Sequence, residues 1–272
     1  NKITKVTQSF FEPALDYVVI KIPRWDLIKF VGATEHIGSA MKSVGEVMAI
    51  GRSFEEALQK AVRMCSGEVE SVTDNGFSAK GGSASGGKNE LSFFLNIPTP
   101  RRIFAIAESL KRGIGVEEIH KITGIDLWFL FRIQNIVKIE KNFLKNNLSA
   151  GKAGDLSKEN LLNLKRAGFS DKKIGHLCGK TELQIRKLRK DLEITPFVFA
   201  IDTLAGEVPA KTNYLYLTYH GAHHDVSPLG EKAIVVLGSG PYHIGSSVEF
   251  DWSCVHASLA LRSHKKQAII IN

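Results

Sequence analysis

The sequence predicts a mainly α-helical central domain flanked by two partial α/β segments. Strand-like runs of β-branched and aromatic residues occur near both ends of the 272-residue chain. Between about residue 100 and residue 198, the apolar residues recur instead at helical spacing. A stretch rich in glycine and serine, residues 66–92, precedes the helical part. This composition predicts a flexible connector between the first segment and the helices.

The first segment predicts two strands followed by a helix. The strand-like runs are residues 17–22 (YVVIKI) and 44–50 (VGEVMAI), which end at Pro23 and Gly51. Ser53 and Glu56 have the spacing of a capping box, in which each side chain bonds the other residue's backbone N–H. Apolar residues then follow at helical spacing as far as Cys65. We therefore expect residues 1–65 to form one α/β unit.

The helical part contains a faint internal repeat with an offset of 55 residues. The matching pairs are Ile119 and Ile174, Ile122 and Leu177, Gly124 and Gly179, Leu130 and Ile185, and Ile133 and Leu188. Each copy predicts a short helix, a turn at its glycine, and a longer helix. We expect residues 66–95 to be a connector and residues 96–225 to be a helical domain built from such hairpins.

The last segment predicts a second α/β unit. Residues 214–219 alternate as in a strand, and residues 233–237 (AIVVL) form an apolar run that leads into a Gly-rich turn. A helix at about 253–262 and a strand at 267–271 complete a βαβ pattern. We expect residues 231–272 to open an α/β domain, with Cys254 on the buried face of its helix.

The composition is that of an ordinary folded protein. Hydrophobic residues make up 43% of the chain and charged residues 24%, which excludes disordered and collagen-like proteins. The three scattered cysteines favour a reducing compartment over a disulfide framework. The longest apolar runs have the length of strands, whereas a membrane span needs about 20 apolar residues. We therefore predict no membrane association.

The net charge of +8 raises the hypothesis of a nucleic-acid partner. The excess lies in residues 96–200, with 20 Lys and Arg against 11 Asp and Glu. Four cations cluster on the second helix of the second repeat, as on the recognition helix of a helix-turn-helix protein: Arg186, Lys187, Arg189 and Lys190. The first repeat has aromatic residues there (Trp128, Phe129 and Phe131), where a DNA reader needs polar groups. We predict no nucleic-acid partner, with a basic helix-turn-helix protein as an alternative.

The Gly-rich turn approaches the dinucleotide-binding pattern G-x-G-x-x-G but departs from it. Gly238 and Gly240 match, while His243 stands where the third glycine belongs and Gly245 comes two residues late. We therefore expect a structural turn and no bound cofactor.

Other groups of polar residues carry weaker signals. A cluster of metal-ligand residue types, His220, His223, His224 and Asp225, is so closely spaced that a solvated loop is favoured over a zinc site. Strand-end carboxylates often serve catalysis, but spacing alone assigns no role to the candidates here, which are Glu12, Asp16, Glu46, Glu249 and Asp251.

Six longer strings resemble carbamoyl-phosphate synthetase, large synthetase subunit or region, and occur in that family's order. They are residues 11–24 (FEPALDYVVIKIPR), 41–52 (MKSVGEVMAIGR), 125–130 (IDLWFL), 168–171 (GFSD), 201–207 (IDTLAGE) and 236–252 (VLGSGPYHIGSSVEFDW). The resemblance covers nearly the whole chain apart from residues 66–92 and about 145–157. Tyr242, His243 and Trp252 are similar to eukaryotic members. We interpret the chain as an internal fragment of such an enzyme.

The resemblance implies a role for each segment. Residues 1–65 resemble the end of the first, carboxyphosphate-forming ATP-grasp unit, and residues 96–225 resemble the oligomerisation domain. Residues 231–272 resemble the Rossmann-like pre-ATP-grasp start of the second, carbamoyl-phosphate-forming unit. The intact enzyme makes carbamoyl phosphate from bicarbonate, ATP and ammonia, taken from glutamine or free, for pyrimidine or for arginine and urea synthesis. Its ATP, Mg²⁺ or Mn²⁺, and K⁺ are expected to bind elsewhere, so the resemblance implies no catalytic, cofactor-binding or metal-binding residue in this chain.

In the family, carbamate travels between the two units through an internal tunnel. Met41, Ser247 and Glu249 match tunnel-lining residues, although bacterial members have glycine in place of Ser247. The resemblance also implies a glutaminase region or subunit as a partner, and self-association through the helical domain. It implies a cytoplasmic location, with the mitochondrial matrix as the alternative. A standalone oligomerisation scaffold is the remaining alternative function.

Overall fold

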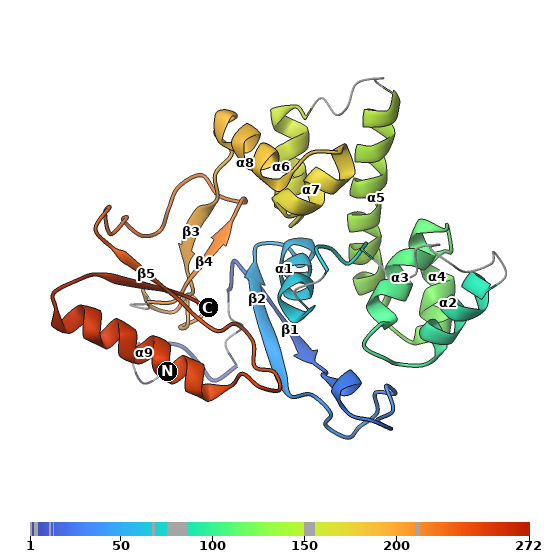
Figure 1. The fold of residues 1–272 in the computed structure, drawn as a ribbon, viewed down its shortest axis with the longest axis horizontal. Coiled ribbons are helices and arrows are strands. Elements are labelled where there is room, and N and C mark those ends of the chain that lie inside the picture. Colours follow the sequence, from blue (N-terminus) through green and yellow to red (C-terminus); the bar gives the residue numbers. More distant parts are fainter. Residues whose placement is uncertain are drawn as a thin grey trace.

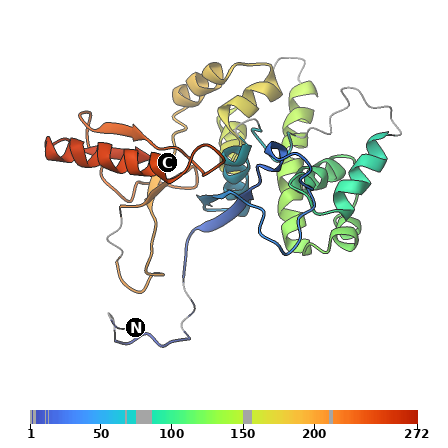
Figure 2. The ribbon, with the colours of Figure 1, turned by 60° about the horizontal axis from the view of Figure 1, so that its bottom comes forward.

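The fold is mainly helical, with three small two-stranded sheets, in this computed structural model (Figure 1). The structure describes residues 2, 5–10, 12, 14–66, 69–74, 86–149, 156–209 and 213–272. This arrangement confirms the predicted mainly α-helical class. In both views the helices labelled α2, α3 and α4 lie at one end of the molecule and α9 lies at the other (Figure 2).

The first α/β unit is an antiparallel strand pair covered by one helix. Strand β1 (Val18–Arg24) pairs with β2 (Gly45–Gly51), so that the first residue of β1 faces the last of β2. A single 3-10 turn, η1 (Leu27–Lys29), follows β1. Helix α1 (Phe54–Ser66) packs on the strands where Val47 and Ala49 are buried. Both predicted strands and the predicted helix are present.

Only half of the expected capping box forms at the start of α1. The Glu56 N–H donates to Ser53 Oγ at 3.2 Å. The Glu56 carboxylate instead accepts from the Arg52 N–H and from the Thr218 hydroxyl, both at 2.9 Å, and lies 2.8 Å from Lys60 Nζ. Glu56 is only 1% exposed. A buried carboxylate must be compensated by charge and hydrogen bonds, so tertiary partners replace the local one.

The helical part consists of seven helices in the described residues. They are α2 (Gly86–Asn96), α3 (Arg102–Lys111), α4 (Val116–Thr123), α5 (Leu127–Ser149), α6 (Lys158–Arg166), α7 (Asp171–Cys178) and α8 (Glu182–Asp191). The predicted repeat is present as the pairs α4–α5 and α7–α8. Gly124 and Gly179 end the first helix of each pair in the left-handed conformation, with φ of +70° and +66°. Ile119 and Ile174, which match in the repeat, are both fully buried.

Helix α1 belongs to the same hydrophobic core as these helices. Leu58 of α1 is buried in one cluster with residues of α2 to α8. Gly168, between α6 and α7, has φ of +85° and lies against α1. A Cβ at Gly168 would come within 2.8 Å of Gln59 Cβ and 3.0 Å of Glu56 Cα. The unit boundary expected after residue 65 therefore does not separate two cores.

The segment expected as a connector is folded in part. Val72 is fully buried, and its N–H donates to Gln59 Oε1 at 2.9 Å. Helix α2 begins at Gly86, inside the expected connector, and buries Leu91. The composition of this segment did not predict its folded parts, because the few residues that are buried stand among many glycines and serines. Residues 67–68 and 75–85, which carry most of that composition, lie outside the described residues.

A buried charge network holds the segment 69–74 against the helices. Glu140 of α5 is 4% exposed and lies 2.9 Å from Lys111 Nζ of α3 and 3.3 Å from Lys173 Nζ of α7. The Thr73 hydroxyl donates to Glu140, and Lys173 pairs with Asp74. Three helices and the segment therefore share one set of ion pairs.

The last part of the chain forms two further strand pairs. Strands β3 (Phe197–Ala200) and β4 (Leu215–Thr218) are antiparallel. Strands β5 (Ile234–Leu237) and β6 (Ala268–Ile271) are parallel and are joined by α9 (Val248–Ser263), as the βαβ pattern predicts. Helix α9 buries none of its residues, and Cys254 is only half-buried. The prediction that Cys254 is a core residue is wrong, because a two-stranded sheet is too narrow to enclose the helix.

None of the helices in the described part of the chain has the length and apolar character that crossing a bilayer requires.

Candidate functional site

Two of the three predicted site residues follow the Gly-rich turn between β5 and α9. His243 and Ser246 close this turn with two mutual backbone hydrogen bonds, each 3.0 Å long. Gly245 has φ of +94°, a conformation that favours glycine. Ile244 and Gly245 therefore form the tip of a tight turn, and the chain enters α9 directly after it at Ser247.

Ser247 and Glu249 bond each other at the start of α9. The Ser247 N–H donates to Glu249 Oε1 at 3.0 Å. A carboxylate in the first turn of a helix satisfies a free N–H and interacts favourably with the helix dipole. The Tyr242 hydroxyl donates to Asp251 in the same turn, and this bond raises the pKa of Tyr242. Glu249 is an exposed helix cap in this structure, and its role in the tunnel stays a prediction.

The first α/β unit binds the tip of the turn. Asp26 Oδ2 accepts from the Ile244 N–H at 2.9 Å, and Lys29 Nζ donates to the Ile244 carbonyl oxygen at 3.0 Å. Asp26 also pairs with Lys29 at 3.2 Å and with Arg24 at 3.3 Å. Residues more than 200 positions apart in the sequence therefore meet at this turn.

Met41 lies in the loop before β2, and its side chain is 88% exposed. Lys42 fastens this loop by donating to two of its backbone carbonyl oxygens, at 3.1 and 2.8 Å. Four residues after Met41, Gly45 lies so close to the Gly-rich turn that a Cβ on it would be 2.1 Å from the Tyr242 carbonyl oxygen. The structure thus brings the end of the Met41 loop beside the turn that leads to Ser247 and Glu249.

Asp26 is the residue at this site that the sequence analysis missed. Its residue exposure is 8%. Burial opposes its ionisation, but the Ile244 N–H and the cations Lys29 and Arg24 outweigh burial and hold the pKa of Asp26 below its ordinary value. An Asp before a short helix predicts an N-cap, yet the Asp26 side chain makes no cap bond to η1. Only the tertiary structure shows that it caps a distant turn.

The histidine-rich loop is a structural element beside β3. His224 Nδ1 and Asp225 Oδ2 accept from backbone N–H groups of β3 at 3.0 and 3.1 Å. His220 Nε2 lies 2.9 Å from the carbonyl oxygen at the end of α6. Within the described ranges, no three His, Cys, Asp or Glu side chains are grouped as metal ligands.

The basic cluster on α8 is divided between core and surface. Arg189 is 8% exposed and contacts Asp171 Oδ2 through Nε at 3.2 Å and Nη2 at 3.1 Å. Lys165 Nζ lies 2.7 Å from the same carboxylate, and burial, offset only in part by Asp171, lowers the pKa of Lys165 to about 8. Arg186, Lys187 and Lys190 are exposed. Arg189 is therefore a core cation, so the alternative of a phosphate-binding helix loses one of its four cations.

The remaining predicted carboxylates lie at the surface. Glu12 is exposed, Asp16 pairs with Arg52, and Glu46 pairs with Lys21 at 2.8 Å.

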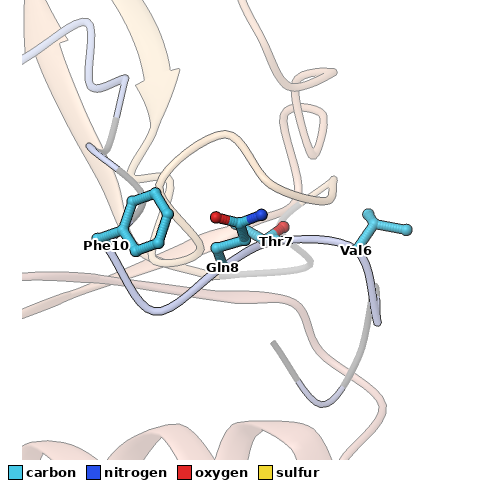
Figure 3. Close-up of a pocket in the computed structure, with 4 residues that line it drawn as sticks. All are labelled: Val6, Thr7, Gln8 and Phe10. Atoms are coloured by element: carbon cyan, nitrogen blue, oxygen red, sulfur yellow. The ribbon is translucent and has the colours of Figure 1, made fainter.

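Two cavities lie away from the predicted site residues. The cavity in Figure 3 measures about 410 Å³ and is lined by four residues of the N-terminal segment: Val6, Thr7, Gln8 and Phe10. Val6 and Phe10 are 81% and 83% exposed. A second cavity of about 510 Å³ lies beside β3 and includes Asp16, Asp202 and Asp225. Neither cavity is lined by Met41, Ser247 or Glu249.

Comparison with protein families decides the relationship. The family model described as carbamoyl-phosphate synthetase large chain, oligomerisation domain, matches residues 46–193, which is more than half of the chain. The chain belongs to the carbamoyl-phosphate synthetase large-chain family. A second model, carbamoyl phosphate synthase preATP-grasp domain, matches residues 230–272. These matches confirm the resemblance found in the six sequence strings. The first match begins within β2 and so includes α1, in agreement with the shared core.

Curated relatives align with this member of the carbamoyl-phosphate synthetase family over its whole length. It is 46% identical to the mitochondrial carbamoyl-phosphate synthase (ammonia) of Aquarana catesbeiana and covers 18% of that protein. It is 46% identical to the mitochondrial arginine-specific carbamoyl phosphate synthase large chain of Neurospora crassa, covering 22% of it. It is 44% identical to the multifunctional protein ura1 of Schizosaccharomyces pombe, covering 11%. The chain thus spans about a fifth or less of the length of these relatives.

Proposed function

We propose that this chain is the region of a carbamoyl-phosphate synthetase that joins its two ATP-using units. Residues 1–65 end the first, carboxyphosphate-forming unit, and residues 66–95 connect it to the helical oligomerisation domain at 96–225. Residues 231–272 begin the second, carbamoyl-phosphate-forming unit. The observation that carries this proposal is the alignment of all 272 residues with carbamoyl-phosphate synthases at 46% identity. The docking of the Gly-rich turn on Asp26 supports it, because that contact joins the first segment to the last.

In this proposal the intact enzyme makes carbamoyl phosphate from bicarbonate, ATP and ammonia. The ammonia comes from a glutaminase region or subunit or is taken up free, and the product serves pyrimidine or arginine and urea synthesis. The helical domain supplies self-association. The enzyme works in the cytoplasm or, as the alternative, in the mitochondrial matrix. The relatives from Aquarana catesbeiana and Neurospora crassa are named as mitochondrial proteins.

ATP, Mg²⁺ or Mn²⁺, and K⁺ belong to other parts of the intact enzyme in this proposal. The described residues contain no group of three His, Cys, Asp or Glu side chains that could hold a metal ion. The proposal assigns no chemical step of the synthesis to this chain, because the matching segments of the family lie outside the nucleotide-binding cores.

The role of the chain in the reaction is to line part of the path of carbamate between the units. Met41, Ser247 and Glu249 are the residues proposed for this lining. Two contacts support the grouping: the closeness of Gly45, after the Met41 loop, to Tyr242, and the bond from the Ser247 N–H to Glu249. That bond fixes the Glu249 carboxylate beside the turn.

The division of labour between this chain and the intact enzyme can be tested by phosphate release from ATP. We expect the 272-residue chain alone to show neither ATP hydrolysis nor carbamoyl phosphate synthesis, and the full-length protein to show both with bicarbonate. Turnover by the chain alone at the rate of the full-length enzyme contradicts the proposal.

Glu249→Gln in the full-length enzyme tests the tunnel residue. Glutamine keeps a hydrogen-bond acceptor for the Ser247 N–H and removes only the charge. We expect bicarbonate-dependent ATP hydrolysis to continue while the yield of carbamoyl phosphate falls. Asp251→Asn removes a charge from the same helical turn and is the control, in which the yield of carbamoyl phosphate should stay proportional to ATP hydrolysis. If the yield stays proportional to hydrolysis in Glu249→Gln as well, Glu249 is a helix cap only.

A further inference from the structure

At the tip of the Gly-rich turn, both the backbone N–H and the carbonyl oxygen of Ile244 are hydrogen-bonded to charged side chains. The turn itself uses the N–H and carbonyl groups of His243 and Ser246. The Ile244 N–H and carbonyl oxygen take no part in that closure and bond Asp26 at 2.9 Å and Lys29 at 3.0 Å. Asp26 and Lys29 also pair with each other at 3.2 Å. One ion pair therefore satisfies both a donor and an acceptor of the turn.

The Asp26 half of this ion pair is built into the fold. The Asp26 side chain is 10% exposed and receives a third bond from Arg24, whereas Lys29 is 43% exposed. Charge-assisted hydrogen bonds of this kind are shorter and stronger than neutral ones. A second contact restricts the turn independently, since Gly45 leaves no room for a side chain between β2 and the Tyr242 carbonyl oxygen. Together these contacts fix both the distance and the orientation of the turn.

We propose that Asp26, with Lys29, is a positioning residue that sets the Gly-rich turn, and with it Ser247 and Glu249, against the Met41 loop. Its consequence for catalysis rests on the proposed function, in which these residues line the path of carbamate. Asp26 acts through the Ile244 backbone and touches no reactant. Because Ser247 lies three residues after Ile244, a shift of the turn tip moves the start of α9 with it.

Hydrogen exchange in the 272-residue chain tests the contact without any reference to activity. Asp26→Asn removes the charge while keeping an acceptor oxygen. We expect the Ile244 amide to exchange about tenfold faster, because a charge-assisted bond is replaced by a weaker neutral one. Asp191→Asn is the control, since Asp191 is exposed at the end of α8, and residues 241–247 should exchange as in the unchanged chain. Unchanged exchange at Ile244 in Asp26→Asn overturns the proposal.

Coupling in the full-length enzyme tests the consequence. For Asp26→Asn and, independently, Gly45→Ala, we expect bicarbonate-dependent ATP hydrolysis to persist while the ATP consumed per carbamoyl phosphate rises. Small displacements of positioned groups carry large costs. A purely structural defect lowers both activities together and leaves the ATP consumed per carbamoyl phosphate unchanged. The control Asp191→Asn should leave that ratio unchanged as well. An unchanged ratio with faster Ile244 exchange overturns the positioning role. Absence of bicarbonate-dependent hydrolysis in the unmodified protein contradicts the proposed function instead, and the exchange experiment then decides the contact alone.

Discussion

Replacing Gly168 by alanine tests whether α1 is built into the helical core. Gly168 sits between α6 and α7 with φ of +85°, and its carbonyl oxygen accepts from Arg63 of α1. A Cβ there would lie 2.8 Å from Gln59 Cβ and 3.1 Å from the Glu56 carbonyl oxygen. Both neighbours belong to the rigid body of α1 and cannot rotate away.

The expected loss of stability has two parts. Placing a side chain in the left-handed region costs about 1–2 kcal/mol. Forcing a methyl group into a filled contact costs a further ~1–3 kcal/mol. Gly113→Ala separates the backbone cost from the contact cost, because Gly113 has a similar φ of +90° but no atom within 4 Å of an added Cβ. Gly168→Ala should therefore lower the free energy of unfolding by about 2–5 kcal/mol, and Gly113→Ala by only about 1–2 kcal/mol.

Urea unfolding of the 272-residue chain, followed by circular dichroism, measures both variants. The free energies come from linear extrapolation, and equal slopes show that the same surface unfolds in each case. The informative quantity is the difference between the two variants, which isolates the contact with α1. Equal destabilisation by the two substitutions would refute the shared core.

Three further predictions concern buried charges. Glu140→Ala removes one of the two carboxylate partners of Lys173, which is 5% exposed and keeps Asp74, so the substitution should cost about 1–3 kcal/mol in the same urea assay. A loss within the error of the assay speaks against the network. Burial opposes ionisation of Glu140, but Lys173 and Lys111 hold its pKa below the ordinary value. Its contribution to stability is therefore present above the ordinary carboxyl pKa and lost as pH falls toward the folded value, and Glu140→Gln should flatten the acid limb of the stability profile. Burial lowers the pKa of Lys165 from its ordinary value of 10.5 to about 8. Between these two pH values, Lys165 therefore binds fewer protons in the folded chain than in the unfolded chain. Its contribution to stability should rise with pH across that window, and Lys165→Met should abolish this rise between pH values of about 8 and 10.

Much of the fold follows from local patterns in the sequence. The strands β1 and β2, the helix α1 and the βαβ unit appear where the periodicity predicts them. The repeat centred on Gly124 and Gly179 is equally local, because a helix that ends in the left-handed conformation calls for glycine at that position. Ser247 and Glu249 could be singled out from the sequence only through their resemblance to a family.

The tertiary structure decided what each polar and buried group does. Ser53 and Glu56 have the spacing of a capping box, yet Glu56 turns to Thr218, 162 residues away. Composition predicts a connector where Val72 is fully buried, and it leaves open the alternative of a recognition helix where Arg189 is a core cation. Asp26 lies 218 residues from the turn that it binds. Periodicity reports only which face of an element is apolar. The partner of a charge depends on which distant segments the apolar core brings together, and a buried charge takes whichever partner lies there because its desolvation must be compensated.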